Sequence, residues 1–172
     1  METTDSDKHW YVVLTRTNSE RKVRDYFQLQ EVDTFLPVQN RVIEREGKRI
    51  ERERLLLPRM VFVHISRQEM AAVRSTLNVY DFLRDRSTGA PTCIPDAQMA
   101  DFRYMLDYSQ DQVILTGEYI PKGTRVVVAK GDLQGLRGEL VRYNNKYHIL
   151  VRIDMFGSAM VTIPASYVRK EK

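Results

Sequence analysis

The chain contains a single cysteine, Cys93, and no long hydrophobic run among its 172 residues. One cysteine excludes an internal disulfide and agrees with a reducing compartment, so we expect a cytoplasmic protein. No apolar stretch approaches the roughly 18 residues that a membrane-spanning helix needs. Residues 1–8 are polar and partly acidic, so we expect a disordered tail there rather than a signal peptide.

The common catalytic and cofactor-binding motifs are also missing. The sequence has no GxxxxGK[ST], GxGxxG, HExxH or GxSxG motif. Its histidines, His9, His64 and His148, are far apart, and none has a partner at ligand spacing. We therefore expect no metal, no cofactor and no enzyme. An activity sensitive to substitution of His64 or Cys93 would be needed to revive the enzyme hypothesis.

The composition is that of a globular protein with a modest positive charge. Apolar residues make up 42% of the chain and charged residues 29%, with a net charge of +4 and a pI near 9.2. This charge permits contact with nucleic acid but does not require it.

The first 107 residues alternate between strand and helix patterns. We predict strands at 9–15, 35–43, 55–65 and 80–83, and helices at about 19–30, at 68–74 and from 95 onward. Val23 and Phe27 lie on one face of the first helix. The pattern is typical of an α+β domain.

The C-terminal part has strand patterns only. Gly131, Gly135 and Gly138 follow the first of these strand patterns, and we expect these glycines to mark a turn with positive φ, a bulge or a close backbone approach. Strands are predicted at 125–128, 139–143, 147–153 and 159–163, with a two-residue turn at Asn144–Asn145. Residues 108–119 form a weakly patterned linker, so residues 120–172 are expected to be a small all-β unit.

Residues 44–54 are nearly all charged. The plain interpretation is a solvated hairpin or a disordered loop with its tip near Gly47. The alternative is an arm that contacts the phosphate backbone of nucleic acid, although neighbouring carboxylates weaken that interpretation because they cancel much of the field.

Two groups of residues are candidates for contact surfaces. The cations Arg16, Arg21, Lys22 and Arg24 surround Tyr26; they form either a solvated helix face or a nucleic-acid contact with a base stacked on the tyrosine. The apolar residues Leu14, Leu57, Met60 and Phe62 form either core or a groove for a partner's helix.

Three sequence blocks, in order, resemble the NusG family of transcription factors. Trp10-Tyr11-Val12-Val13 and the following helix resemble the opening of its N-terminal (NGN) domain, and Leu57–Val63 resembles that domain's proline-led strand. Gly131–Gly138 and Val151–Gly157 resemble the C-terminal KOW domain. The resemblance implies an antiparallel sheet flanked by helices at 9–107, a linker at 108–119 and a KOW barrel at 120–172.

The resemblance also implies partners. A monomer of this kind binds the clamp helices of the largest RNA polymerase subunit, here through Leu14, Leu57, Met60 and Phe62. Specialised members read non-template DNA, and the matching positions are Arg16, Lys22 and Tyr26; nascent RNA is the alternative nucleic-acid partner. The KOW domain binds ribosomal protein S10 or Rho in well-known members, through a loop that corresponds here to Leu133, Met155 and Phe156.

The sequence departs from the family pattern at two motifs. Pro58-Arg59-Met60 replaces Pro-Gly-Tyr, and Gly131-Asp132-Leu133 replaces Gly-Pro-Phe. These changes favour a specialised paralogue similar to the UpxY-type antiterminators of capsular polysaccharide operons. The alternatives are a general elongation factor that couples polymerase to Rho or the ribosome, and an RNA- or ribosome-binding KOW protein. The β-branched strands of the C-terminal unit predict that it stays β rather than refolding into helices.

Overall fold

The computed structural model describes residues 8–172, so the expected tail at residues 1–8 lies almost wholly outside the described residues. The chain divides into two compact units. The first unit comprises Met1–Val38 and Leu55–Asp96, and the second comprises Gln39–Arg54 and Ala97–Lys172. In the described part, no helix is long and apolar enough to cross a membrane.

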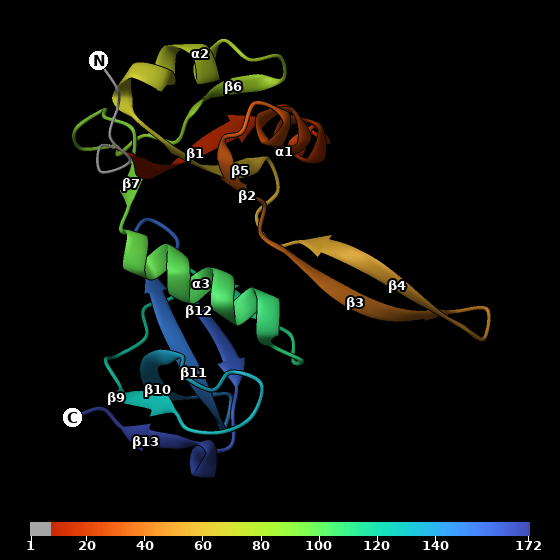
Figure 1. Cartoon of the computed structure of the whole chain (residues 1–172). Helices are drawn as coiled ribbons and strands as arrows, with labels where there is room; N and C mark the ends of the chain where they lie inside the picture. The colour runs from red at the N-terminus through yellow and green to blue at the C-terminus, as the bar shows by residue number, and fades with distance from the viewer. Residues whose placement is uncertain (1–7) are drawn as a thin grey trace. The chain divides into compact units, whose positions relative to one another are not determined.

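The first unit is an antiparallel sheet with helices on one face (Figure 1). Its strand order is β2 (Asp33–Phe35), β5 (Met60–Ile65), β1 (His9–Thr15) and β6 (Val79–Phe82), and β7 (Cys93–Ile94) also pairs with β1. Helix α1 (Glu20–Leu29) follows β1, and the 3-10 turn η2 (Arg67–Glu69) leads into α2 (Met70–Arg74).

The core of this unit follows from the alternation of strand residues. Tyr11 and Val13 of β1 point to the helical face, where they pack with Val23 and Phe27 of α1 and Val73 of α2. Each of these side chains is buried. Burial of a side chain of this size contributes roughly 1.5–3 kcal/mol. The predicted apolar face of the first helix is thereby confirmed.

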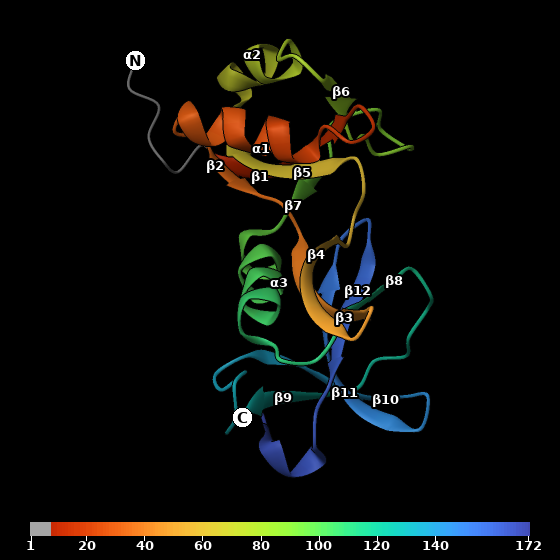
Figure 2. The same ribbon diagram turned by 90° about the vertical axis from the view of Figure 1, so that its right-hand side faces the viewer.

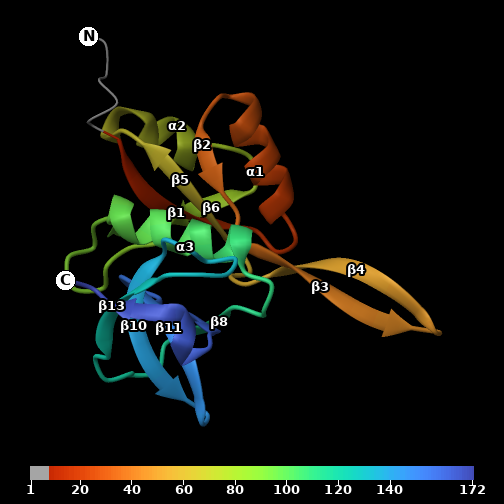
Figure 3. The same ribbon diagram turned by 60° about the horizontal axis from the view of Figure 1, so that its bottom comes forward.

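The second unit contains a six-stranded antiparallel sheet (Figure 2). The strand order is β13 (Val168–Lys170), β9 (Thr124–Val128), β10 (Arg137–Tyr143), β11 (Lys146–Ile153), β12 (Gly157–Thr162) and β8 (Ile114–Thr116). A 3-10 turn, η3 (Ala165–Tyr167), precedes β13, and α3 (Asp96–Tyr108) buries Met99, Phe102, Met105 and Leu106 as the spacing predicts. The strands β3 (Val38–Arg45) and β4 (Lys48–Leu55) form a separate two-stranded ribbon (Figure 3).

Several boundaries differ from the sequence-based expectation. The predicted strand 55–65 is interrupted, because Leu55 ends β4, residues 56–59 form a turn and only Met60–Ile65 forms β5. Strand β8 lies inside the expected linker at 108–119 and pairs with β12. The strands β7 and β13 were not predicted, because two or three residues carry too little pattern without their tertiary neighbours.

The glycine-rich segment before β10 shows two of the expected behaviours. Gly131 and Gly135 adopt φ values of +89° and +94°. At Gly138 a Cβ atom would lie 2.6 Å from the carbonyl oxygen of Leu150, so β10 and β11 approach closely only because this residue lacks a side chain.

Candidate functional site

The face of the first sheet opposite α1 and α2 is apolar and is organised in cross-strand rows. The register places Trp10 opposite His64, Val12 opposite Phe62, and Leu14 opposite Met60. The first two rows are largely buried: Val12 and Phe62 are both 0% exposed. The Trp10 and His64 rings lie 5.0 Å apart, and Phe62 lies 6.0 Å from the ring of its other neighbour, Phe35.

The row formed by Leu14 and Met60 is different, because both side chains are only half-buried. Directly opposed residues of an antiparallel pair have Cβ atoms about 4.5–5.5 Å apart, so these two side chains form one apolar surface. Leu57, in the turn before β5, is also half-buried. The structure therefore places Leu14 and Met60 side by side in one half-buried row, and it places Phe62 in the adjacent, buried row.

The turn that presents Met60 is held by Arg59 and Glu20. Arg59 adopts φ +66°, a left-handed conformation that glycine reaches without strain. Its N–H donates to Oε1 of the buried Glu20 at 2.8 Å, and its Nε donates to the Thr15 carbonyl at 3.3 Å. The Thr15 N–H in turn donates to the Arg59 carbonyl at 2.9 Å. These bonds attach the turn to the end of β1 and to the start of α1.

The three residues predicted to contact DNA are exposed in the structure. Lys22 and Tyr26 are four residues apart on α1 and so share one side of the helix. Tyr26 is 47% exposed, and its ring packs edge-on against Phe27 at 5.8 Å. Arg16 lies in the loop before the helix, where its N–H donates to the Asn78 carbonyl at 2.9 Å. Lys22 and Tyr26 thus offer one cation and one aromatic ring on the same side of α1, and Arg16 offers a second cation in the preceding loop.

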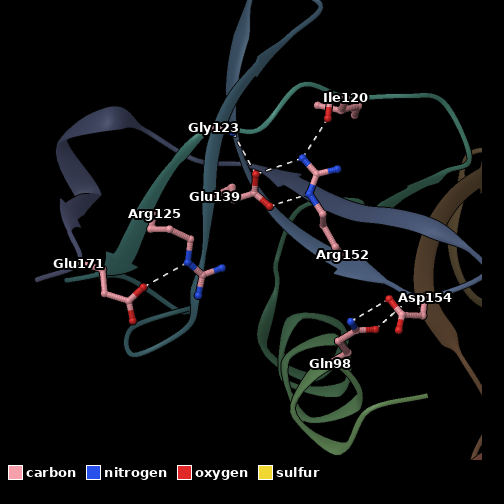
Figure 4. Close-up of polar contacts among 8 residues, drawn as sticks. All are labelled: Gln98, Ile120, Gly123, Arg125, Glu139, Arg152, Asp154 and Glu171. Atoms are coloured by element: carbon pink, nitrogen blue, oxygen red, sulfur yellow. Dashed lines mark hydrogen bonds and ion pairs between the residues drawn. The ribbon is translucent and has the colours of Figure 1, made fainter. Parts of the chain in front are cut away.

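In the second unit, Glu139 of β10 and Arg152 of β11 form an ion pair (Figure 4). Arg152 donates to Glu139 Oε2 at 2.7 Å and Oε1 at 3.0 Å, and it also donates to the Ile120 carbonyl at 2.9 Å. Glu139 is buried, which alone would raise its pKa. The hydrogen bonds from Arg152 and from the Gly123 N–H outweigh this effect and lower the pKa of Glu139 below its ordinary value. The same pairing raises the pKa of Arg152.

The residues predicted to form one partner-binding loop lie in two: Met155 and Phe156 are between β11 and β12, and Leu133 is between β9 and β10. Met155 is 49% exposed and adopts φ +73°, and Phe156 is half-buried. Leu133 is only 7% exposed, so its side chain is part of the interior and presents little surface to a partner. No motif or spacing in the sequence indicated the contact next to the β11–β12 loop. There, Gln98 of α3 donates to Asp154 Oδ1 at 3.0 Å and accepts from the Asp154 N–H at 2.8 Å (Figure 4).

Within residues 8–172, no three His, Cys, Asp or Glu side chains cluster as a metal would need. His148 is buried, and its Nδ1 lies 3.0 Å from the Lys146 carbonyl. Desolvation by neighbouring groups raises the pKa of the Cys93 thiol, and the Asp96 carboxylate raises it further. A thiol with a raised pKa is a weak nucleophile at neutral pH.

Comparison with known proteins identifies relatives of this arrangement. A family described as "Transcription termination factor nusG" matches residues 8–103. NusG of Thermotoga maritima, in a structure that describes its domain interaction, shares 19% identity and a TM-score of 0.52, with 98% of this chain and 100% of that chain covered.

Two crystal structures of an MjSpt4:Spt5 complex also match. Conformation A gives 14% identity, a TM-score of 0.31 and coverage of 95% of this chain and 98% of that chain. Conformation B gives 14% identity, a TM-score of 0.33 and coverage of 94% and 95%. Scores this low carry no argument about this chain. No curated protein sequence matches it.

Proposed function

The chain belongs to the NusG family of transcription factors, and from that premise we propose that it is a specialised antitermination factor. In this proposal it binds RNA polymerase during elongation and promotes transcription of a long operon for capsular or surface polysaccharide synthesis. Residues 9–107 act as the polymerase-binding domain and residues 120–172 as a KOW domain, and residues 108–119 connect them and contribute β8 to the sheet of the second unit. The protein acts as a cytoplasmic monomer without a catalytic group.

The observation that carries the proposal is the half-buried apolar row at the end of the sheet. Leu14 and Met60 offer an apolar surface suited to a helix of the polymerase clamp, and Leu57, half-buried in the turn before β5, is assigned to the same contact by its place in the sequence motif. Phe62 is fully buried in the adjacent row, so it supports Leu14 and Met60 from the interior and does not itself contact the clamp helix. Methionine suits an adaptable interface because its side chain is flexible and polarizable.

Two further surfaces serve the specialised role. Arg16, Lys22 and Tyr26 are exposed and would contact the non-template DNA strand, with a base stacked on the tyrosine. Met155 and Phe156 would contact the partner of the KOW domain, for which family resemblance offers ribosomal protein S10 or Rho. Bridging of this kind needs no chemistry, because a factor that prefers the closed clamp shifts its population by the difference in affinity.

In vitro transcription through a terminator tests the function. The cognate polymerase transcribes two templates, one with the operon's own leader and one with an unrelated leader, each with and without the protein. We expect read-through on the first template only. Equal read-through on both would indicate a general elongation factor. No effect on either would contradict the proposal and favour RNA or ribosome binding by the KOW domain.

A substitution tests the surface. Met60→Glu places a charge in the apolar row, and we expect at least a tenfold loss of polymerase binding, measured by co-purification and by titration. The matched control is Leu29→Glu, which adds the same charge at a side chain that is 81% exposed on α1. Equal losses in both variants would contradict the assignment. Phe62 is unsuitable for this test, because a charge at a fully buried position would disrupt folding.

A further inference from the structure

The ribbon formed by β3 and β4 separates its charges by face. Glu46 and Gly47 form a two-residue turn with φ values of +54° and +74°, the combination found in type I′ turns. In such a turn the flanking residues, Arg45 and Lys48, are directly opposite each other. Opposed residues of an antiparallel pair point to the same face, and successive residues alternate. The turn therefore assigns every residue of the ribbon to one face or the other.

One face carries all but one of the ribbon's cations and none of its acids. We call it the cationic face; it consists of Arg41, Arg45, Lys48, Arg52 and Arg54. The opposite, acidic face carries Glu44, Glu51 and Glu53 with a single cation, Arg49. All of these side chains are exposed, whereas Ile43 and Ile50, which the register places opposite each other on the cationic face, are half-buried. Along the sequence the charges are mixed, but on the folded ribbon they are separated.

Gln39, at the base of the ribbon, bonds to the segment that precedes β8 within the same unit. Gln39 donates to the Asp111 carbonyl at 2.8 Å and accepts from the Val113 N–H at 2.8 Å. A hollow of about 280 Å³ adjoins this tether, and its lining includes Arg41 and Arg54 of the cationic face. The two cations nearest the base therefore sit on an anchored part of the ribbon rather than on a free loop.

We propose that the cationic face binds double-stranded DNA, with the ribbon lying in the major groove and its cations contacting the flanking phosphates. An eight-residue strand spans about 27 Å, and the major groove of B-DNA, about 12 Å wide, admits a two-stranded ribbon. The deep, narrow major groove of A-form RNA does not admit one. The ribbon has no aromatic residue on which unpaired bases could stack, which argues against single strands.

This site lies beyond the proposed polymerase and non-template-strand contacts, since it uses none of their residues and needs no polymerase. The test is fluorescence anisotropy of a labelled 24-base-pair DNA duplex titrated with the full chain at several salt concentrations. Each phosphate contact adds about −0.9 to the slope of log affinity against log salt. We expect a slope between roughly −2 and −4.5 for two to five contacts.

Adjacent substitutions on opposite faces provide the matched control. Lys48→Ala and Arg49→Ala each remove one exposed positive charge, but only Lys48 belongs to the cationic face. Loss of one phosphate contact weakens binding about eightfold at 0.1 M salt. We expect about that loss for Lys48→Ala, less than twofold for Arg49→Ala, and at least 50-fold with a shallower salt slope for the triple variant Arg45→Ala/Lys48→Ala/Arg52→Ala.

Several results would overturn the proposal. These are undetectable duplex binding at 50 mM salt, equal losses for Lys48→Ala and Arg49→Ala, an unchanged affinity of the triple variant, or tighter binding of the same sequence as single-stranded DNA or double-stranded RNA. Circular dichroism confirms that each variant is folded. Polymerase co-purification of the triple variant is expected to be unchanged, so failure of this proposal and failure of the polymerase proposal give different results.

Discussion

Two hairpins in this chain share a turn design and differ in almost everything else. The β3–β4 ribbon turns at Glu46–Gly47 and the β10–β11 hairpin turns at Asn144–Asn145, and all four residues have φ between +49° and +74°. The ribbon pairs with no other strand among residues 8–172, and all its charged side chains are exposed. The β10–β11 hairpin is flanked by β9 and β12 and buries about half of its residues.

The difference shows that neighbouring strands determine whether a charged side chain is paired within the protein or exposed to solvent. In the β10–β11 hairpin, Glu139 and Arg152 pair with each other at 2.7 Å and satisfy the Gly123 N–H and the Ile120 carbonyl. Their charges neutralise each other within the sheet and stabilise the second unit. In the ribbon, exposed charges contribute little to stability, because water screens them, and they remain available to a partner.

The largest expected effect tests this contrast directly. Arg152→Ala leaves the buried Glu139 without its cation, and we expect the free energy of unfolding of the second unit to fall by about 2–4 kcal/mol. Arg52→Ala in the ribbon is the control, with an expected change below about 0.5 kcal/mol. Urea denaturation followed by circular dichroism measures both. Similar losses of unfolding free energy in the two variants would contradict the inference that charges stabilise the β10–β11 hairpin but not the ribbon.

The second test compares glycines of the two hairpins. Gly138→Ala would place its Cβ 2.6 Å from the Leu150 carbonyl oxygen and 3.0 Å from Cγ1 of Ile149. Such overpacking costs about 1–3 kcal/mol, and we expect a lower urea midpoint for the second unit. Gly47→Ala has no atom within 4 Å of the new Cβ, so only the left-handed φ costs energy, about 1–2 kcal/mol.

Because the ribbon stands apart from the six-stranded sheet, we expect Gly47→Ala to leave that sheet's urea midpoint unchanged. Faster amide hydrogen exchange confined to β3 and β4 would report its local effect. A lower midpoint in Gly47→Ala would show that the ribbon and the sheet unfold together.

The smallest expected effect is on pH dependence. The pKa of Glu139 is lowered in the folded state, so the folded state binds fewer protons than the unfolded state as Glu titrates. Its stabilisation is complete above the ordinary glutamate pKa of about 4.3 and is lost as pH falls through the lowered value. We expect stability of the second unit to decrease below about pH 4.

Glu139→Gln should make that acid-induced loss smaller, measured as the urea midpoint at pH 3 and pH 6. Asp101 acts in the opposite direction, because burial raises its pKa against the influence of Arg125 and Arg137. Asp101→Asn is therefore the control and should steepen the loss rather than reduce it. An unchanged pH profile in Glu139→Gln would contradict the role given to the ion pair.

Strong local patterns predicted much of the fold. The predicted strand 9–15 matches β1, and the turn at Asn144–Asn145 is in the expected place. The break between Leu55 and Met60 was missed, because four apolar residues and a proline resemble a strand in sequence, and only the structure shows that Arg59 adopts φ +66°. The short strands β7, β8 and β13 exist only through their partners.

In the candidate sites, too, the sequence indicated the residues, but the tertiary structure determined which of them are exposed. The sequence indicated Leu14 and Met60 as either core or surface, and only the register of β1 against β5 shows that they form one half-buried row. The sequence likewise indicated Phe62 as either core or surface, and the structure shows that its side chain is fully buried in the core. Leu133 is likewise interior rather than exposed.

By itself, the sequence determined the family, the order of most elements and the absence of catalytic motifs, because these depend on local composition and spacing. Only the tertiary structure decided which side chains share a face. The segment 44–54 shows why: its residues average to mixed charge along the chain, and a turn at Glu46–Gly47 separates them because strand side chains alternate with a period of two.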